Sequence, residues 1–66
     1  MSIARVTEIS ASSSKSFDKA IQKGIKRASE TLQNITGAWV ESQKVTVKDG
    51  EIDQYRVMMK ITFILK

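Results

Sequence analysis

The stretch VTVKDGEID, residues 45–53, contains the sequence signal that decides the fold. Asp49-Gly50 is a strong indicator of a β-hairpin, because both central residues of a type I′ turn need a positive φ angle. The flanking residues include several β-branched side chains, which favour strands. We therefore predict two antiparallel strands, over residues 38–48 and 52–65, joined by this turn.

The last of these strands shows a regular alternation of side chains. The two alternating sets are Tyr55, Val57, Met59, Ile61, Phe63 and Leu65, and Arg56, Met58, Lys60, Thr62 and Ile64. Successive side chains of a strand point to opposite faces of the sheet. We expect the first, more apolar set to face a helix and the second set to face away from it.

A helix is predicted to begin after Ser16 and to end within residues 34–37. Small or apolar residues recur there at helical spacing, at Phe17, Ala20, Ile21, Gly24, Ile25, Ala28 and Leu32. Ser16 is the expected N-cap, with Asp18 favourably placed in the first turn. Gly37 is expected to close the helix with a positive φ angle. Gly24 lies within the apolar stripe, where we expect the helix to approach the sheet closely.

Residues 3–9 are rich in Ile, Val and Thr and are predicted to form a first strand, followed by a loop over the serine-rich stretch SASSSKS. The element order is then β-α-β-β within a single domain, residues 1–66. A right-handed crossover gives an α+β fold with a three-stranded antiparallel sheet, order 1-3-2, and one helix on one face. The other face stays uncovered and should carry Trp39 and Met58, which predicts an assembly or ligand surface there.

A chain of 66 residues buries only a small core, and it has neither Cys nor His to support that core by disulfides or a typical zinc site. Self-association is the remaining means of stabilisation. The same composition argues against an enzyme, because the carboxylates show no catalytic spacing and the usual general bases and thiols are missing. No apolar run has the length of a membrane span. We expect a soluble, cytoplasmic protein.

The net charge of +4 leaves open what the basic residues do. Lys15, Lys19 and Lys23 line one helical edge, and Lys26 and Arg27 follow. Such a stripe would suit a nucleic acid, but no recognised nucleic-acid-binding motif accompanies it, so a solvated face is the preferred interpretation. The acidic residues around the hairpin could alternatively hold a hard cation such as Ca²⁺; they are Asp49, Glu51 and Asp53.

The order, spacing and length of these segments resemble the dodecin family over nearly the whole chain. The segments that carry the resemblance are RVTEIS, KSFDKAI, RASETLQNI, the Asp-Gly hairpin and YRVMMKITFIL. The resemblance implies a β-α-β-β subunit, assembly into hollow homododecamers, and, in many members, flavin binding. It also implies a Trp after the helix that stacks on the flavin ring and a Gln after a Tyr that hydrogen-bonds the ring edge.

This sequence departs from the family at both ligand-binding positions. In a gapless register the Trp position is Gly37, and the Gln position is Arg56. Trp39 lies two residues later, so it should project from the same face as Gly37, displaced by about 6.6 Å. Gln43 would share this face in an unbulged strand and could replace the missing amide.

Each of these residues has an alternative interpretation. Trp39 could anchor a subunit interface instead of, or in addition to, stacking on a flat ligand. Arg56 could form a salt bridge with Glu41 or Glu8. As a donor-only cation, Arg56 suits a carbonyl pair, a phosphate or a carboxylate better than an edge that also donates.

The sequence therefore predicts a non-catalytic protein that binds and stores a flavin, FMN or riboflavin, in a hollow homo-oligomeric shell. The predicted cofactor-binding residues are Trp39, Arg56, Gln43 and Gly37, with no catalytic or metal-binding residue. The storage role follows from the resemblance. The first alternative is a dodecin-like shell that holds another anion or a metal ion or serves only as a scaffold, and the second is a basic nucleic-acid-binding domain.

Overall fold

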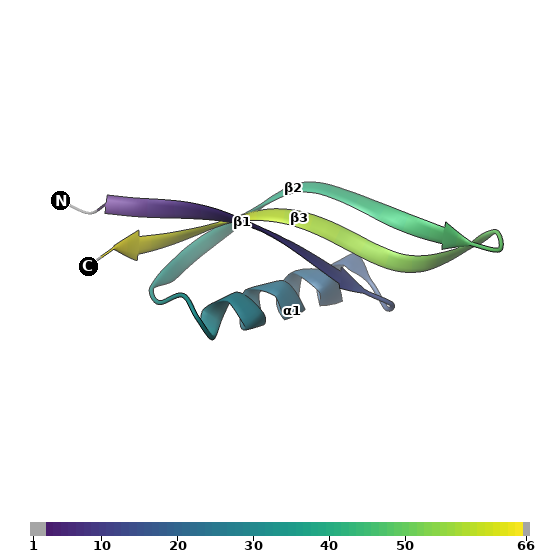
Figure 1. Ribbon diagram of the computed structural model, residues 1–66, viewed down its shortest axis with the longest axis horizontal. Helices are drawn as coiled ribbons and strands as arrows, with labels where there is room; N and C mark the ends of the chain where they lie inside the picture. The colour runs from purple at the N-terminus through teal and green to yellow at the C-terminus, as the bar shows by residue number, and fades with distance from the viewer. Residues whose placement is uncertain (1–2, 66) are drawn as a thin grey trace.

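The computed structural model describes residues 3–65, which form one sheet and one helix (Figure 1). The elements in chain order are β1 (Ile3–Ser13), α1 (Phe17–Ser29), β2 (Ile35–Lys48) and β3 (Glu51–Leu65). β3 lies in the middle of the sheet and pairs antiparallel with β1 on one side and with β2 on the other. The predicted α+β fold with strand order 1-3-2 and one helix is confirmed.

The hydrophobic core lies between α1 and one face of the sheet. The buried apolar side chains of residues 3–65 are Ala20, Ala28, Val57, Met59 and Ile61. The three from β3 belong to the alternating set that was expected to face the helix. At the start of α1, the ring of Phe17 meets the ring of Tyr55 edge to face, with centroids 5.1 Å apart. In the part of the chain described here, no helix is both long and apolar enough to cross a membrane.

Gly24 allows α1 to lie directly against the sheet. A Cβ atom at this position would be 2.7 Å from Cε of Met59 and 3.0 Å from Cβ of Ala11. Both separations are shorter than ordinary van der Waals contact, so a larger residue would require the end of the Met59 side chain and the neighbouring Ala11 to shift. The predicted close approach at Gly24 is confirmed.

β1 is longer than the sequence indicated. Residues 10–13 continue the strand opposite residues 55–58 of β3, so the prediction of a loop over this serine-rich stretch was wrong. The unpaired backbone groups of β3 provide hydrogen-bond partners, and these outweigh the modest strand preference of serine. Ser16 is the N-cap of α1 as predicted, and its side-chain oxygen accepts a hydrogen bond from the backbone N–H of Lys19 at 3.0 Å.

The end of the helix also differs from the prediction. α1 ends at Ser29, and Glu30 is its C-cap. The left-handed backbone conformation occurs at Asn34, with φ 63°, and not at Gly37. Asn adopts this conformation more readily than most residues because its short polar side chain can hydrogen-bond locally. Gly37 lies inside β2, opposite Thr62 of β3, so β2 begins three residues earlier than predicted.

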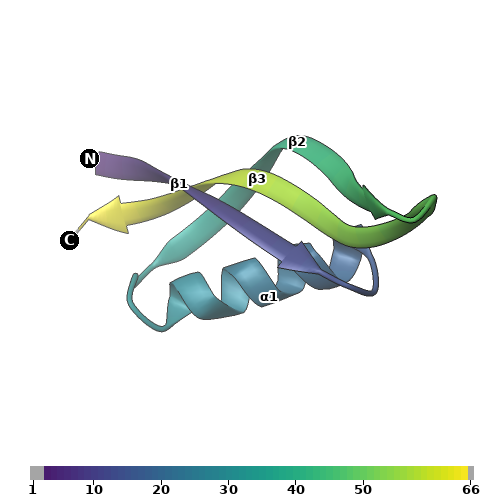
Figure 2. The same cartoon turned by 45° about the vertical axis from the view of Figure 1, so that its right-hand side comes forward.

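The β2–β3 hairpin has the geometry that its sequence predicted. Asp49 has φ 53° and Gly50 has φ 77°, so both central residues of the turn have positive φ angles. Residues 45–53, which we call the hairpin arm, extend past the N-terminal end of α1 (Figures 1 and 2). The arm contributes to an elongated molecule whose longest dimension is 51 Å.

Candidate ligand-binding site

The sheet has one face that α1 leaves uncovered, which we call the open face (Figure 2). Because residues directly opposite each other on neighbouring strands point to the same side, the strand register defines four rows across this face. The rows are Val6, Thr62 and Gly37; Glu8, Lys60 and Trp39; Ser10, Met58 and Ser42; and Ser12, Arg56 and Lys44. Consecutive rows are two residues apart along β3, or about 6.6 Å.

Trp39 is the large aromatic group of the open face, and 65% of its surface is exposed. Its partner on β3 is Lys60, and the partner of Gly37 is Thr62. Lys60 and Thr62 are alternate residues of β3, so Trp39 and Gly37 share one face, as predicted. A Cβ atom at Gly37 would have no neighbour within 4 Å, which leaves room for a ligand beside Trp39.

Lys60 lies over the Trp39 ring. Its Nζ atom is 5.3 Å from the ring centroid and 3.6 Å from Oε2 of Glu41. The ammonium group is thus held by a cation–π contact on one side and by a carboxylate on the other. Both contacts are partly exposed and therefore weak, so a flat ligand can displace the ammonium group and stack on the indole.

Arg56 lies two rows away from Trp39. It is flanked by Ser12 on β1 and Lys44 on β2, and it lines a hollow of about 300 Å³ together with Ser10, Ser42, Lys44 and Met58. The alternative that Arg56 pairs with Glu41 or Glu8 is not what the structure shows. Within residues 3–65 the ion pairs are Arg27 with Glu30 and Lys60 with Glu41. Two cations and two hydroxyl groups around one hollow form a site suited to an anion.

Gln43 does not share the face of Trp39, so its predicted position was wrong. A β-bulge between Val40 and Ser42 inserts an extra residue, Glu41, into β2. Past the bulge the alternation is reversed, and Gln43 lies opposite Val57, whose side chain is buried under α1. Ser42 and Lys44 take the places on the open face that an unbulged strand would have given to Glu41 and Gln43.

Sequence reasoning missed four residues of the open face, namely Ser10, Ser12, Ser42 and Lys44. Ser10 and Ser12 were assigned to a loop, and the bulge exchanged the faces of Ser42 and Lys44. Neither Gly nor Pro marks the bulge in the sequence, so no local signal pointed to it. Lys60 was correctly placed on the uncovered face, but its contact with Trp39 depends on the pairing of β2 with β3.

The acidic residues of the hairpin arm do not form a metal site. Among residues 3–65, no three His, Cys, Asp or Glu side chains come close enough together to hold a metal ion. Asp49, Glu51 and Asp53 are all exposed and separated along the arm. The alternative of a cation bound by these three residues in one subunit therefore has no support in the structure.

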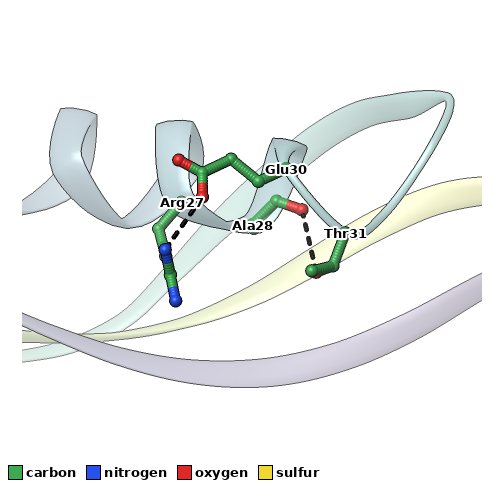
Figure 3. Close-up of polar contacts among 4 residues, drawn as sticks. All are labelled: Arg27, Ala28, Glu30 and Thr31. Atoms are coloured by element: carbon green, nitrogen blue, oxygen red, sulfur yellow. Dashed lines mark hydrogen bonds and ion pairs between the residues drawn. The ribbon is translucent and has the colours of Figure 1, made fainter.

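A second hollow, of about 560 Å³, lies between α1 and β1 on the helix side of the sheet, and we call it the helix groove. Its lining residues are Thr7, Ile9, Ser10, Ala11, Ser12, Lys23, Gly24, Arg27, Ala28, Thr31 and Leu32. Figure 3 shows Arg27 beside β1, with its guanidinium 2.9 Å from Oε2 of Glu30, and the Thr31 hydroxyl 3.5 Å from the carbonyl oxygen of Ala28. The basic residues of the helix stripe are all exposed, as the solvated-face interpretation expects, and two of them, Lys23 and Arg27, also border this groove.

Comparisons with known proteins agree with the fold. The family model described as Dodecin matches residues 3–66. A dodecin from Streptomyces davaonensis is 38% identical, with 98% of this chain and 96% of that chain covered, and superposes with a TM-score of 0.94. No curated protein sequence matches the chain.

Two further solved structures show the range of similar proteins. A dodecin from Streptomyces coelicolor is 29% identical over 98% of this chain and 93% of that chain, with a TM-score of 0.95. A protein from Mycobacterium tuberculosis, described as a calcium-chelating immunodominant antigen and calcium dodecin, is 26% identical over 97% of this chain and 91% of that chain, with a TM-score of 0.84. The match to each of them extends over almost the full length of both chains.

Proposed function

The chain belongs to the dodecin family, and we propose that it is a non-catalytic protein that stores or sequesters a flavin, FMN or riboflavin, inside a hollow homododecameric shell. The observation that carries this proposal is the exposure of Trp39 on the open face, where 65% of its surface is accessible. An indole with this exposure offers a flat ligand a stacking surface. The same surface is available to a second copy of the chain.

The small core supports self-association. Five apolar side chains are buried within residues 3–65, while eight large hydrophobic side chains of the same part of the chain are exposed. Three of the exposed side chains, Val6, Trp39 and Met58, lie on the open face. A domain of this size gains little stability from its own core, so covering this face with another copy removes apolar surface from water and stabilises the fold.

The position of Arg56 favours a phosphorylated flavin. The row of Arg56 is the second row after that of Trp39, which corresponds to four residues or about 13 Å along β3. A stacked flavin ring with an extended ribityl phosphate tail can span this length. A guanidinium group forms two parallel hydrogen bonds with a phosphate, and Lys44 adds a second positive charge beside it. Arg56 has no acceptor for a ring N–H, so the phosphate end of FMN fits the Arg56 row better than the ring edge does.

A titration tests the proposal directly. Increasing amounts of the flavin-free protein are added to riboflavin and to FMN, and the flavin fluorescence is recorded. We expect both to be quenched at micromolar protein concentration, FMN at the lower concentration. Trp39→Ala should abolish quenching, whereas Trp39→Phe, which keeps a flat ring, should retain part of it.

Ile3→Ala is the matched control, because Ile3 is 63% exposed but lies on the opposite face of the sheet at its far end. This variant should quench like the wild type. Unchanged fluorescence of both flavins with an assembled wild-type protein would exclude the flavin-binding function.

A second candidate is a shell that holds an ion in place of flavin. It is favoured by the similarity to a protein described as a calcium dodecin. Because one subunit groups no three acidic side chains within residues 3–65, a site built on several carboxylates would need ligands from more than one copy. Calorimetric titration of the chelator-treated assembly with CaCl₂ separates the two candidates: heat from Ca²⁺ without any quenching of flavin favours the second.

A further inference from the structure

Most of the net positive charge of the chain lies on and beside the helix, where the proposed flavin site does not use it. Residues 15–30 contain five of the eleven Lys and Arg residues and two of the seven acidic residues, so they carry +3 of the net charge of +4. All five cationic residues are exposed. This concentration of charge on one element creates a local positive potential that attracts anions.

Four of these cations form one continuous row along α1, which we call the basic stripe: Lys19, Lys23, Lys26 and Arg27. Successive residues of an α-helix are about 100° apart around its axis and rise by about 1.5 Å along it. The four residues therefore lie within an arc of about 100° and over about 12 Å of helix length. Asp18 lies about 80° outside this arc. The basic stripe is thus a straight, narrow track of positive charge.

Little within the chain neutralises the basic stripe. Within residues 3–65, Lys19, Lys23 and Lys26 take part in no ion pair. Arg27 pairs with Glu30 at 2.9 Å (Figure 3), but 82% and 53% of these side chains are exposed, so the pair is weak. The helix groove beside the stripe has no acidic residue in its lining. The positive charge of the stripe therefore remains available to an external anion.

The shape and chemistry of the basic stripe favour a chain of phosphates without bases. Proteins that bind single-stranded nucleic acids stack the bases on aromatic side chains. The stripe offers none, because Phe17, the one aromatic residue of α1, packs against Tyr55. A nucleic-acid duplex is much wider than the stripe and would bring its phosphates close to the carboxylate of Asp18. A narrow, flexible polyphosphate chain can instead follow the cations alone.

We propose that the basic stripe binds inorganic polyphosphate, with its three ammonium groups and one guanidinium group contacting phosphate oxygens along the chain. Such charge-assisted hydrogen bonds are stronger than those between neutral groups. The stripe lies on the helix side of the sheet and belongs to a single subunit. This binding therefore depends neither on the flavin site of the open face nor on assembly.

Neutralisation of two lysines tests the assignment. The stripe variant is Lys19→Gln with Lys26→Gln, because both residues are exposed and neither lines the helix groove. Dye-labelled long-chain polyphosphate is titrated with the protein, and fluorescence anisotropy is recorded at several salt concentrations. At low salt the variant should bind about tenfold more weakly than the wild type. The slope of log affinity against log salt concentration should become shallower by roughly one for each lysine removed.

The matched control is Arg5→Gln with Lys48→Gln. Both residues are exposed and lie outside α1, and the change in net charge equals that of the stripe variant. The affinity of the control should stay within about threefold of the wild type, because charges away from the contact are screened. A loss equal to that of the stripe variant would show that binding follows the net charge alone, and would overturn the assignment. Circular dichroism checks that both variants are folded.

Removal of an acid tests the position of the stripe from the opposite direction. Glu30 follows α1 in helical conformation and lies within the arc of the stripe, whereas Asp18 lies outside it. Glu30→Gln and Asp18→Asn raise the net charge equally, but only Glu30→Gln also releases Arg27. We expect about three- to fivefold tighter binding of polyphosphate for Glu30→Gln and less than about a twofold change for Asp18→Asn. Equal effects of the two variants would contradict the stripe.

Competition and a third variant identify the ligand and its place. Single-stranded and duplex DNA are added as unlabelled competitors at equal phosphate concentration, and both should displace polyphosphate less effectively than unlabelled polyphosphate does. DNA that competes equally well or better would contradict polyphosphate as the ligand. Arg56→Gln changes the anion site of the open face and should leave polyphosphate binding within about twofold of the wild type. A loss as large as that of the stripe variant would place the polyphosphate chain on the open face.

The flavin titration keeps the failure of this inference separate from the failure of the proposed function. The stripe variant should quench FMN like the wild type, because Lys19 and Lys26 lie on the helix and not on the open face. A wild-type protein that quenches FMN but does not bind polyphosphate contradicts only the polyphosphate site. A wild-type protein that binds polyphosphate through the stripe without quenching any flavin contradicts only the flavin function.

Discussion

On the side of β3 that meets α1, Met59 and Ile61 have no exposed surface, whereas on the opposite side the neighbouring Met58 is 36% exposed. Successive side chains of β3 point to opposite sides of the sheet, so these neighbouring residues lie in different environments. The side under the helix is packed against small helix residues and gives the domain its stability. The open face keeps apolar and charged groups accessible, so in one subunit it contributes little to stability and is available for binding.

Substitution of the two methionines is the strongest test of this contrast. Met59→Ala removes a fully buried side chain from the core and should lower the free energy of unfolding by about 3 kcal/mol. Met58→Ala removes the same atoms from the open face and should lower it by less than about 1 kcal/mol. Urea unfolding followed by circular dichroism, at one protein concentration at which both variants are monomeric, gives the comparison. Equal losses would show that the open face is as tightly packed as the core.

Arg56→Gln tests the open face as an anion site. Loss of a charge-assisted hydrogen bond costs about 1.5 kcal/mol, which corresponds to roughly a tenfold weaker binding of FMN. Riboflavin has no phosphate, so its affinity should change by less than about threefold. Fluorescence titration with both flavins measures the ratio. A parallel loss for the two flavins would place the phosphate away from the Arg56 row.

Lys60→Met should produce the smallest effect. The substitution keeps much of the aliphatic chain but removes the ammonium group from above Trp39 and from Glu41. Because stacking no longer has to displace this cation, riboflavin should bind about two- to fivefold more tightly, the equivalent of about 0.5–1 kcal/mol. Unfolding stability should stay within about 0.5 kcal/mol of the wild type. Weaker binding of riboflavin would instead show that Lys60 contacts the ligand.

The sequence predicted the elements whose signals are local. The Asp49-Gly50 turn, the N-cap at Ser16 and the close approach at Gly24 follow from backbone geometry and spacing within a few residues. The alternation in β3 correctly separated the buried side chains from the open face. These features determined the topology because a chain this short offers few other arrangements.

The parts that sequence reasoning missed depend on pairing between distant segments. The bulge at Glu41 is a property of the register between β2 and β3, and it moved Gln43 to the helix side and Lys44 to the open face. The extension of β1 through Ser13 likewise depends on the partner strand. For this reason Trp39, which precedes the bulge, and Arg56, which lies on β3, were predicted on the correct face, whereas Gln43, which follows the bulge, was not.

The single tryptophan and the single tyrosine of the chain lie on opposite sides of the same sheet. Trp39 stands in solvent on the open face, and Tyr55 meets Phe17 at the start of α1. The protein thus has two natural optical labels that report on separate events. A blue shift of the indole emission signals that the open face has been covered, while the near-ultraviolet dichroism of the phenol signals that the helix remains in place. Assembly and unfolding can therefore be followed in the same unlabelled sample.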